Sequence, residues 1–209
     1  MKVAVTGASG FIGSEIVRVL LDRGHTVHGT VRNTSNEEKT GPLRTLDGAN
    51  ERLVLFTADL LDDDSFDDAF AGCDIIMHVA SPYVIDVDDA QRDLVDPAVR
   101  GTRAVLLAAD RSGCQRVVLT SSTAAITDEP ESRRYTEADW NTLSSLTRNP
   151  YYYSKTLAER SAWDFVDAES PSFDLIVINP AGVIGPSLAP SVNTSNRITM
   201  DLLNGGVYP

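Results

Sequence analysis

The sequence predicts a doubly wound α/β fold, in which helices cover both faces of a parallel sheet. Short apolar runs, each as long as a buried strand, alternate along the chain with segments in which apolar residues recur at helical spacing. A glycine-rich turn joins the first apolar run to the first helical segment. Strands that are apolar throughout are typical of parallel sheets, because both faces of such sheets are buried.

Six segments have the length and composition of strands: Lys2–Thr6, Thr26–Val31, Leu53–Thr57, Asp74–Val79, Arg116–Thr120 and Phe173–Ile178. Five segments are expected to form helices: Phe11–Arg23, Glu37–Leu46, Asp62–Phe70, Asp89–Ser112 and Tyr151–Ala168. The first of these helices is followed by Gly24, a residue type that commonly ends helices. From Pro180 onward an irregular stretch precedes one more helix candidate, Arg197–Asn204.

The length and composition are those of an ordinary globular chain. It has 209 residues, of which 42% are hydrophobic, and this suffices for the core of one domain with room for a small second lobe. It carries 18 basic and 30 acidic side chains, a formal net charge of -12. This balance argues against nucleic-acid partners and against docking on an anionic membrane, because both need clustered Lys and Arg.

No apolar run approaches the roughly 18 residues of a membrane span, and the N-terminus has the pattern of a first strand rather than of a signal peptide. We therefore expect a cytoplasmic protein, in which Cys73 and Cys114 are reduced thiols packed in the core. Neither cysteine has a Cys or His at metal-ligand spacing, and the Asp-rich stretches lack the ligand alternation of a calcium loop. No metal site is expected.

The segment Thr6–Gly13 has the pattern of a dinucleotide-binding turn. It follows the first strand and opens the first helix, where glycines let the backbone turn tightly and approach a pyrophosphate at the helix N-terminus. The alternative is that the glycines serve only a tight turn. The expected cofactor contacts come from Gly7, Ser9, Gly10, Phe11, Ile12 and Gly13.

The end of the second strand indicates which dinucleotide is bound. An acidic residue at this place favours NAD, whereas an arginine accommodates the 2′-phosphate of NADP. The sequence has Val31-Arg32-Asn33 there, with no acid, and Lys39 can add a second positive charge. Asp59, at the end of the third strand, can contact the adenine amine. The alternatives are that both cations are solvated surface charges and that Asp59 only begins an acidic run.

Two further segments have the residues of a proton-transfer site. Tyr151 and Lys155 are four residues apart in a helical segment and therefore share one helix face. A nearby cation lowers the pKa of a phenol from about 10, so that Tyr151 can exchange a proton with a substrate oxygen; Tyr152 is the weaker candidate. Ser121 and Ser122 follow the fifth strand, at the edge where open α/β sheets bind ligands. The alternatives are surface packing of the Tyr–Lys pair and a capping role for the serines.

Together these segments resemble the extended short-chain dehydrogenase/reductases, a Rossmann-type superfamily that includes NAD-dependent epimerases and dehydratases. The nearest branch looks like that of dihydroflavonol 4-reductase and cinnamoyl-CoA reductase. The resemblance runs from Lys2 to about Pro209 and rests on the following motifs: Thr6–Gly13, Val31-Arg32, Asp59-Leu60, Gly72-Cys73-Asp74, His78-Val79-Ala80-Ser81-Pro82, Thr120-Ser121-Ser122, Tyr151–Lys155, Thr156-Leu157-Ala158-Glu159 and Ile178-Asn179-Pro180 through Gly185-Pro186.

The resemblance implies a role for each matching residue. Ser122, rather than Ser121, hydrogen-bonds the substrate carbonyl, while Tyr151 donates the proton. Lys155 holds the nicotinamide ribose and lowers the pKa of the tyrosine, and Arg32 grips the 2′-phosphate. The other implied cofactor-binding residues are Lys39, Asp59, Leu60, Val79, Ala80, Ser81, Tyr151, Pro180, Gly182 and Val183.

The implied reaction is NADPH-dependent hydride transfer to a ketone or aldehyde of a bulky small molecule. The resemblance assigns residues 1–180 to an NADP-binding Rossmann domain that carries the catalytic Ser, Tyr and Lys. Residues 181–209 are expected to form only the beginning of the substrate-binding lobe, so that the chain is truncated, because the family usually runs longer. Thr127 stands where the plant flavonoid enzymes carry an asparagine, which argues against a flavonoid substrate.

Two other functions stay open at this point, and so does the oligomeric state, although homodimers are common in such families. A sugar-nucleotide epimerase or dehydratase would keep NAD bound, and Arg32 argues against it. A non-catalytic NADP(H)-binding sensor need not retain Ser122, Tyr151 and Lys155 together.

Overall fold

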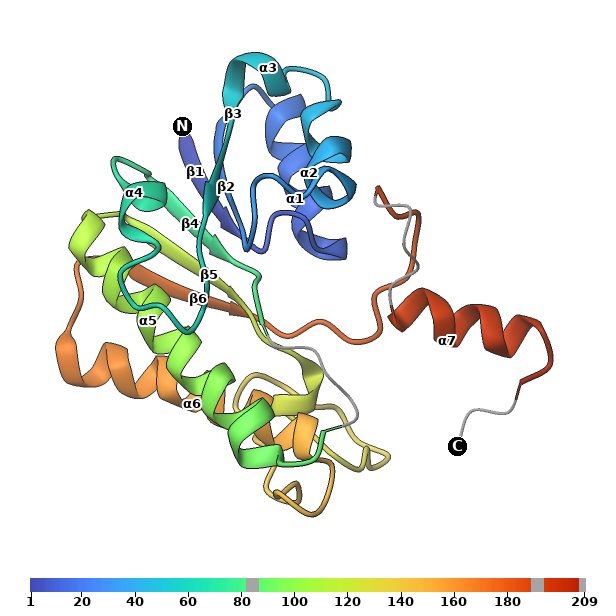
Figure 1. Ribbon diagram of the computed structural model, residues 1–209. Helices are drawn as coiled ribbons and strands as arrows, with labels where there is room; N and C mark the ends of the chain where they lie inside the picture. The colour runs from blue at the N-terminus through green and yellow to red at the C-terminus, as the bar shows by residue number, and fades with distance from the viewer. Residues whose placement is uncertain (82–86, 189–193, 207–209) are drawn as a thin grey trace.

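The computed structural model of the chain describes residues 1–81, 87–188 and 194–206. Its centre is one six-stranded sheet in the order β3-β2-β1-β4-β5-β6, in which every neighbouring pair is parallel (Figure 1). The expected doubly wound α/β fold is therefore confirmed. The strands are β1 (Lys2–Thr6), β2 (Thr26–Val31), β3 (Leu53–Thr57), β4 (Ile75–His78), β5 (Arg116–Thr120) and β6 (Asp174–Ile178).

The strand order reverses between β1 and β4. The chain first builds outward from β1 to β3, then returns to place β4 on the other side of β1, with Thr6 opposite His78 in the register. At such a reversal the loops leaving the two strands diverge, and a ligand crevice opens at the carboxyl ends of the strands. The glycine turn after β1 and the loop after β4 lie on the two sides of this point.

Helices cover both faces of the sheet (Figure 1). One layer consists of α1 (Phe11–Asp22), α2 (Glu37–Arg44) and α3 (Ala49–Arg52), and the other consists of α4 (Asp67–Phe70), α5 (Asp96–Ser112) and α6 (Pro150–Glu169). The helix α7 (Thr194–Leu203) lies beside the carboxyl edge of the sheet, apart from both layers. Among the described residues, no helix is both long and apolar enough to cross a membrane.

Alternate residues of the strands supply two separate cores. Val3, Val5 and Val27 pack with residues of α1, whereas Ala4 and Ile76 pack against α5 and α6 on the opposite face. This division follows from the strand geometry, which points successive side chains to opposite faces. Cys73 and Cys114 are buried in the second of these cores, as expected, and burial raises the pKa of the Cys73 thiol to about 11.

The expected helix over Asp62–Phe70 is wrong in its first half, because helix begins only at Asp67. The hydroxyl of Ser65 donates to the carbonyls of Asp59 and Asp62 and accepts from the amide of Asp59. A serine that bonds nearby backbone groups in this way offers the chain a turn in place of a helix.

The expected helix over Asp89–Ser112 is two elements. A π-helical turn, η1 (Gln91–Val95), precedes α5, and the amide of Asp96 bonds the carbonyl of Gln91, five residues back. Pro97 has no amide hydrogen and stands in the first turn of α5, where a missing donor is tolerated.

The remaining differences are at element ends and in short pieces. The sequence did not indicate α3 or the 3₁₀ turn η2 (Thr123–Ala125), and the last helix spans Thr194–Leu203 instead of Arg197–Asn204. The elements α3 and η2 are single turns, too short for their apolar residues to show a helical period. Pro82 of the motif quoted above, and residues 189–193 and 207–209 of the expected C-terminal lobe, lie outside the described residues.

Gly13 lets α1 start directly beside the turn that follows β1. A Cβ atom at Gly13 would lie 2.2 Å from the carbonyl oxygen of Gly7, which belongs to the rigid backbone of the turn. We expect Gly13→Ala to lower the free energy of unfolding by at least about 2 kcal/mol, because the backbone has to shift. Urea denaturation measures this. The control is Gly41→Ala in α2, where the nearest atom lies 3.8 Å away; an equal loss in both variants would contradict the packing argument.

Candidate active site

The N-terminus of α1 has the features of an anion site. Gly7 adopts a left-handed φ of 64°, and a Cβ there would lie 3.0 Å from the Cα of Ala80, so the turn after β1 approaches the loop after β4 closely. Gly10 precedes the helix and, within the described residues, no side chain caps it and no acid stands in its first turn. The amides at the start of a helix need acceptors, and an anion such as a phosphate supplies them. The first residues of α1 that carry these amides are Phe11, Ile12 and Gly13.

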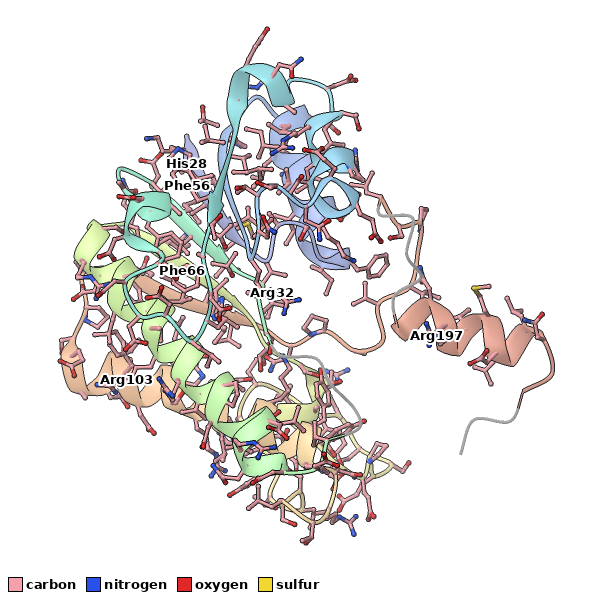
Figure 2. All side chains as sticks on the ribbon, in the orientation of Figure 1. His28, Arg32, Phe56, Phe66, Arg103 and Arg197 are labelled. Carbon is pink, nitrogen blue, oxygen red and sulfur yellow. The ribbon has the colours of Figure 1, made fainter. Side chains whose placement is uncertain are left out.

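Arg32 lies at the carboxyl end of β2, beside this turn (Figure 2). Its side chain is exposed, and among the described residues its guanidinium has no hydrogen-bond or ion-pair partner. Lys39 is half-buried in the first turn of α2. Asp59 is exposed beyond β3, where its carboxylate accepts a hydrogen bond from the amide of Leu61. The side chain of Leu60 packs against Gly101 of α5. The fold therefore brings Arg32 and Asp59 to neighbouring strand ends.

Thr6 fixes the loop after β4 through three hydrogen bonds. Its hydroxyl oxygen accepts from the amides of Val79 and Ala80, both at 3.0 Å. Both lone pairs are then engaged, so the hydroxyl hydrogen is donated to Nδ1 of His78, 2.8 Å away. Burial, together with the smaller effect of the charge of Lys155, lowers the pKa of His78 to about 3, so the ring is neutral and carries its proton on Nε2.

Lys155 and Tyr151 share one face of α6, as the spacing predicts. The ammonium of Lys155 lies 5.8 Å from the centre of the Tyr151 ring and donates a hydrogen bond to Ser81 Oγ at 2.7 Å. Burial lowers the pKa of Lys155 to about 8. Tyr151 is half-buried, whereas Tyr152 is more exposed, which fits the order of preference between these two phenols.

The structure separates the two serines after β5. Ser121 is buried, and its hydroxyl donates to the carboxylate of Glu159 at 2.5 Å. The hydroxyl oxygen of Ser122 accepts from the amide of Ala124 and so caps η2. A capping hydroxyl still has its hydrogen to donate, and Ser122 is half-buried rather than enclosed. Ser122 is therefore the serine that can hydrogen-bond a ligand.

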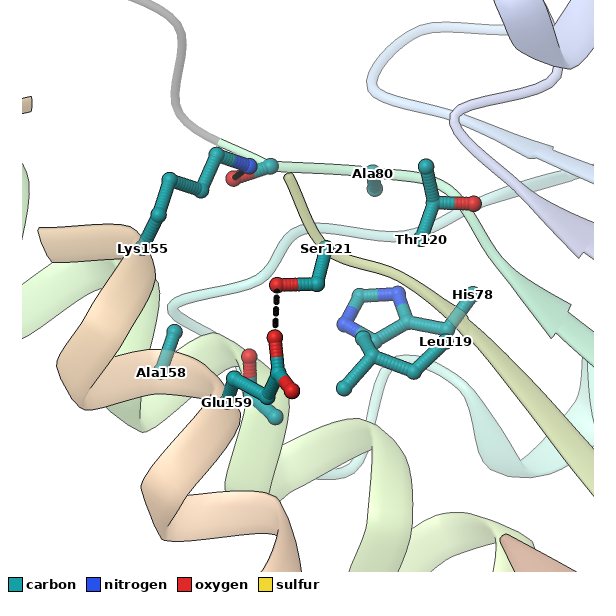
Figure 3. A pocket seen from close by; sticks show the side chains of 10 residues that line it. His78, Ala80, Leu119, Thr120, Ser121, Lys155, Ala158 and Glu159 are labelled. Atoms are coloured by element: carbon teal, nitrogen blue, oxygen red, sulfur yellow. Dashed lines mark hydrogen bonds between the residues drawn. The ribbon is translucent and has the colours of Figure 1, made fainter. Parts of the chain in front are cut away.

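The segment after β6 completes the carboxyl edge. The carbonyl of Pro180 accepts a hydrogen bond from the amide of Thr123, which ties this segment to the end of β5. Gly182 is exposed and Val183 is half-buried. Beneath the edge lies a cavity of about 10 Å³, at the lower limit of what admits one water molecule (Figure 3). Its polar lining includes His78, Ser81, Thr102, Ser121, Lys155 and Glu159.

A sequence model described as the NAD dependent epimerase/dehydratase family matches residues 3–204 of this chain. The chain belongs to that family. The resemblance to this superfamily was expected from the sequence, and the expectation is confirmed.

Named relatives place the chain near the reductases of this epimerase/dehydratase family. It is 46% identical to a cinnamoyl-CoA reductase of Medicago truncatula over 97% of this chain and 64% of that protein. It is 39% identical to a dihydroflavonol 4-reductase of Hordeum vulgare over 97% of this chain and 59% of that protein. The chain thus spans about three fifths of the length of these relatives. The expected likeness to this branch is confirmed.

A solved reductase structure has a similar fold. The yeast methylglyoxal/isovaleraldehyde reductase Gre2, complexed with NADPH, superimposes with a TM-score of 0.87 at 32% identity, over 100% of this chain and 68% of that one. Sequence reasoning from the residues alone did not single out Thr6 or His78. The available signal was their register: each is the last residue of a strand, and the two strands are neighbours at the reversal of the sheet.

The buried ammonium of Lys155 has a cost for folding. Below pH 8 this lysine is charged in both the folded and the unfolded chain, and the folded chain bears the full cost of burying the charge. Between pH 8 and the ordinary pKa of 10.5 the folded chain releases the proton first, and the cost shrinks. We expect Lys155→Met to raise the free energy of unfolding by about 2 kcal/mol at pH 7, after allowance for the lost hydrogen bond to Ser81.

The gain in the free energy of unfolding of Lys155→Met over the parent chain should decline between pH 8 and 10. Urea denaturation at pH 7, 8, 9 and 10 measures it, with Lys2→Met, at the opposite edge of the sheet, as the control for loss of a lysine elsewhere. A less stable Lys155→Met, or a difference that does not change with pH, would contradict this account.

Proposed function

We propose that the chain is the cofactor-binding and catalytic part of an NADPH-dependent oxidoreductase that reduces a ketone or aldehyde of a bulky small molecule to the alcohol. The observation that carries the proposal is the convergence of Tyr151, Lys155 and Ser122 at the carboxyl edge, next to the uncapped start of α1. The names of the relatives support it, and so does the NADPH complex of the yeast reductase.

The residues present fit a dinucleotide. The close approach of Gly7 to Ala80 leaves room for backbone but for no Cβ, and the free amides of α1 suit a pyrophosphate bound by Gly7, Ser9, Gly10, Phe11, Ile12 and Gly13. Arg32 and Lys39 hold the 2′-phosphate and Asp59 the adenine amine. Along the rest of the cofactor lie Leu60, Val79, Ala80, Ser81, Pro180, Gly182 and Val183.

The proposed chemistry divides between the cofactor and three side chains. When bound, NADPH supplies the hydride for the carbonyl carbon. Ser122 donates a hydrogen bond to the substrate oxygen and holds it beside the phenol of Tyr151, which protonates the developing alkoxide. The ammonium of Lys155 favours the phenolate that remains and holds the nicotinamide ribose.

An epimerase or dehydratase with bound NAD is less well supported. The cation Arg32, where an acid would favour NAD, argues for a cofactor with a 2′-phosphate. Residues 1–180 then serve as the NADP-binding domain and residues 181–209 begin the substrate lobe.

Oxidation of NADPH and of NADH against a panel of aryl ketones, aldehydes and 2-oxo compounds tests the proposal directly, and a chain that turns over none of them with NADPH would contradict it.

Tyr151→Phe should lower kcat by at least about 100-fold, because the proton donor is removed. The dissociation constant of NADPH should stay within about 3-fold, since the phosphate contacts are untouched. Stopped-flow hydride transfer and fluorescence titration of NADPH measure the two effects. Tyr152→Phe, one residue along the helix, is the matched control and should keep the parent rate. A Tyr151→Phe variant with the parent rate would remove Tyr151 from the mechanism.

Arg32→Asp should weaken NADPH binding by about 100-fold, because a charge-assisted contact is replaced by repulsion, and should change NADH binding far less. Calorimetric titration with both cofactors measures this difference. Arg23→Asp, which makes the same charge change at the far end of α1, is the control. Equal losses for NADPH and NADH would rule out the 2′-phosphate role of Arg32.

A further inference from the structure

Glu159 is a buried carboxylate on the catalytic face of α6. It follows Tyr151 by eight residues and Lys155 by four, so the three side chains lie along one side of the helix. Its exposed fraction is 7%. Glu residues are rarely buried unless their oxygens are fully hydrogen-bonded. The proposed chemistry uses Tyr151 and Lys155 but gives Glu159 no part.

The carboxylate receives two strong hydrogen bonds from two different strand ends. Its Oε2 atom accepts from the hydroxyl of Ser121 at 2.5 Å and from Nδ2 of Asn179 at 2.6 Å. Figure 3 shows the Ser121 hydroxyl and the Glu159 carboxylate facing each other across the space between β5 and α6. Ser121 follows β5 and Asn179 follows β6, so one acceptor joins three elements of the fold.

Asn179 carries this contact on to the backbone of the catalytic serine. The same Nδ2 group also donates to the carbonyl oxygen of Ser122 at 3.1 Å. Just past the ends of β5 and β6, the amide of Ser121 bonds the carbonyl of Ile178, and the amide of Thr123 bonds that of Pro180. Ser122 is therefore held between two backbone hydrogen bonds and the Asn179 amide.

We propose that Glu159 is a positioning residue, which fixes the Ser122 segment relative to Tyr151 by accepting hydrogen bonds from Ser121 and Asn179. A carboxylate suits this task because it only accepts, and both of its partners donate. Without it, the buried hydroxyl of Ser121 and the half-buried amide of Asn179 would lose this acceptor, and the strand ends would no longer be tied to α6. The effect on rate rests on the proposed reductase function, whereas the structural contact does not.

Three variants test the proposal in kinetics. Glu159→Leu removes the acceptor of both hydrogen bonds and should lower kcat by about 10-fold to 100-fold, since a misplaced catalytic group is costly, while KM for NADPH stays within about 3-fold. Glu159→Gln can place its amide oxygen where Oε2 lies and still accept from both Ser121 and Asn179, as a neutral and weaker acceptor, so it should lose only about 3-fold. Glu169→Leu, at the exposed end of the same helix, is the matched control. Equal kcat values for Glu159→Leu and Glu169→Leu would overturn the proposal.

Hydrogen exchange measured by mass spectrometry needs neither cofactor nor substrate. Glu159→Leu should speed exchange in peptides over residues 119–124 and 178–182 by about 10-fold and leave residues 7–14 unchanged, because the loss is local. Acceleration in every peptide would mean a general role in stability, and acceleration in none would mean that Glu159 does not hold the strand ends; either result would overturn the proposal.

If Glu159→Leu does not fold, Asn179→Ala cuts the same connection at its other end and should give the same local exchange pattern. If the parent chain turns over no carbonyl compound, the proposed function fails, and the exchange experiment still decides whether Glu159 positions the strand ends.

Discussion

The parallel pairing of β1 with β4 is the constraint on which the candidate site depends. It places Thr6 opposite His78, so that one hydroxyl can bond the amides of Val79 and Ala80 and the imidazole of His78. The same pairing brings the glycine turn within contact of Ala80. Ser81, the next residue, then receives the hydrogen bond of Lys155. The glycine turn and α6 thus both contact the loop after β4.

Three buried ionisable side chains lie together at the carboxyl edge of the sheet. The cores on both faces are built of aliphatic and aromatic side chains, whereas His78, Lys155 and Glu159 are buried together under the strand ends. The pKa shifts of His78 and Lys155 both express the cost of holding a charge where water is excluded. Sites that arrange such groups commonly give up stability for chemistry, and the apolar cores offset the loss.

The helix α6 places Tyr151, Lys155 and Glu159, which are spaced four residues apart in the sequence, along one of its sides. Tyr151, Lys155 and Glu159 each meet a different surrounding: the open edge, the loop after β4 and the ends of β5 and β6. The helix packs against α5, and its Phe165 side chain lies in the hydrophobic core. Apolar contacts therefore set the position of the helix. The polar contacts then refine that position at the end where the chemistry is proposed.

The sequence by itself determined the local features of this protein: the six strands to within one residue, the glycine turn and the shared face of Tyr151 and Lys155. These follow from periodicity and from backbone freedom, which neighbouring residues express. Only the tertiary structure decided that Ser121 turns inward to Glu159 and that Glu159 meets Asn179. Such contacts join residues that are 20 to 72 positions apart in the sequence. No local pattern encodes these contacts, because they depend on strand order and helix packing.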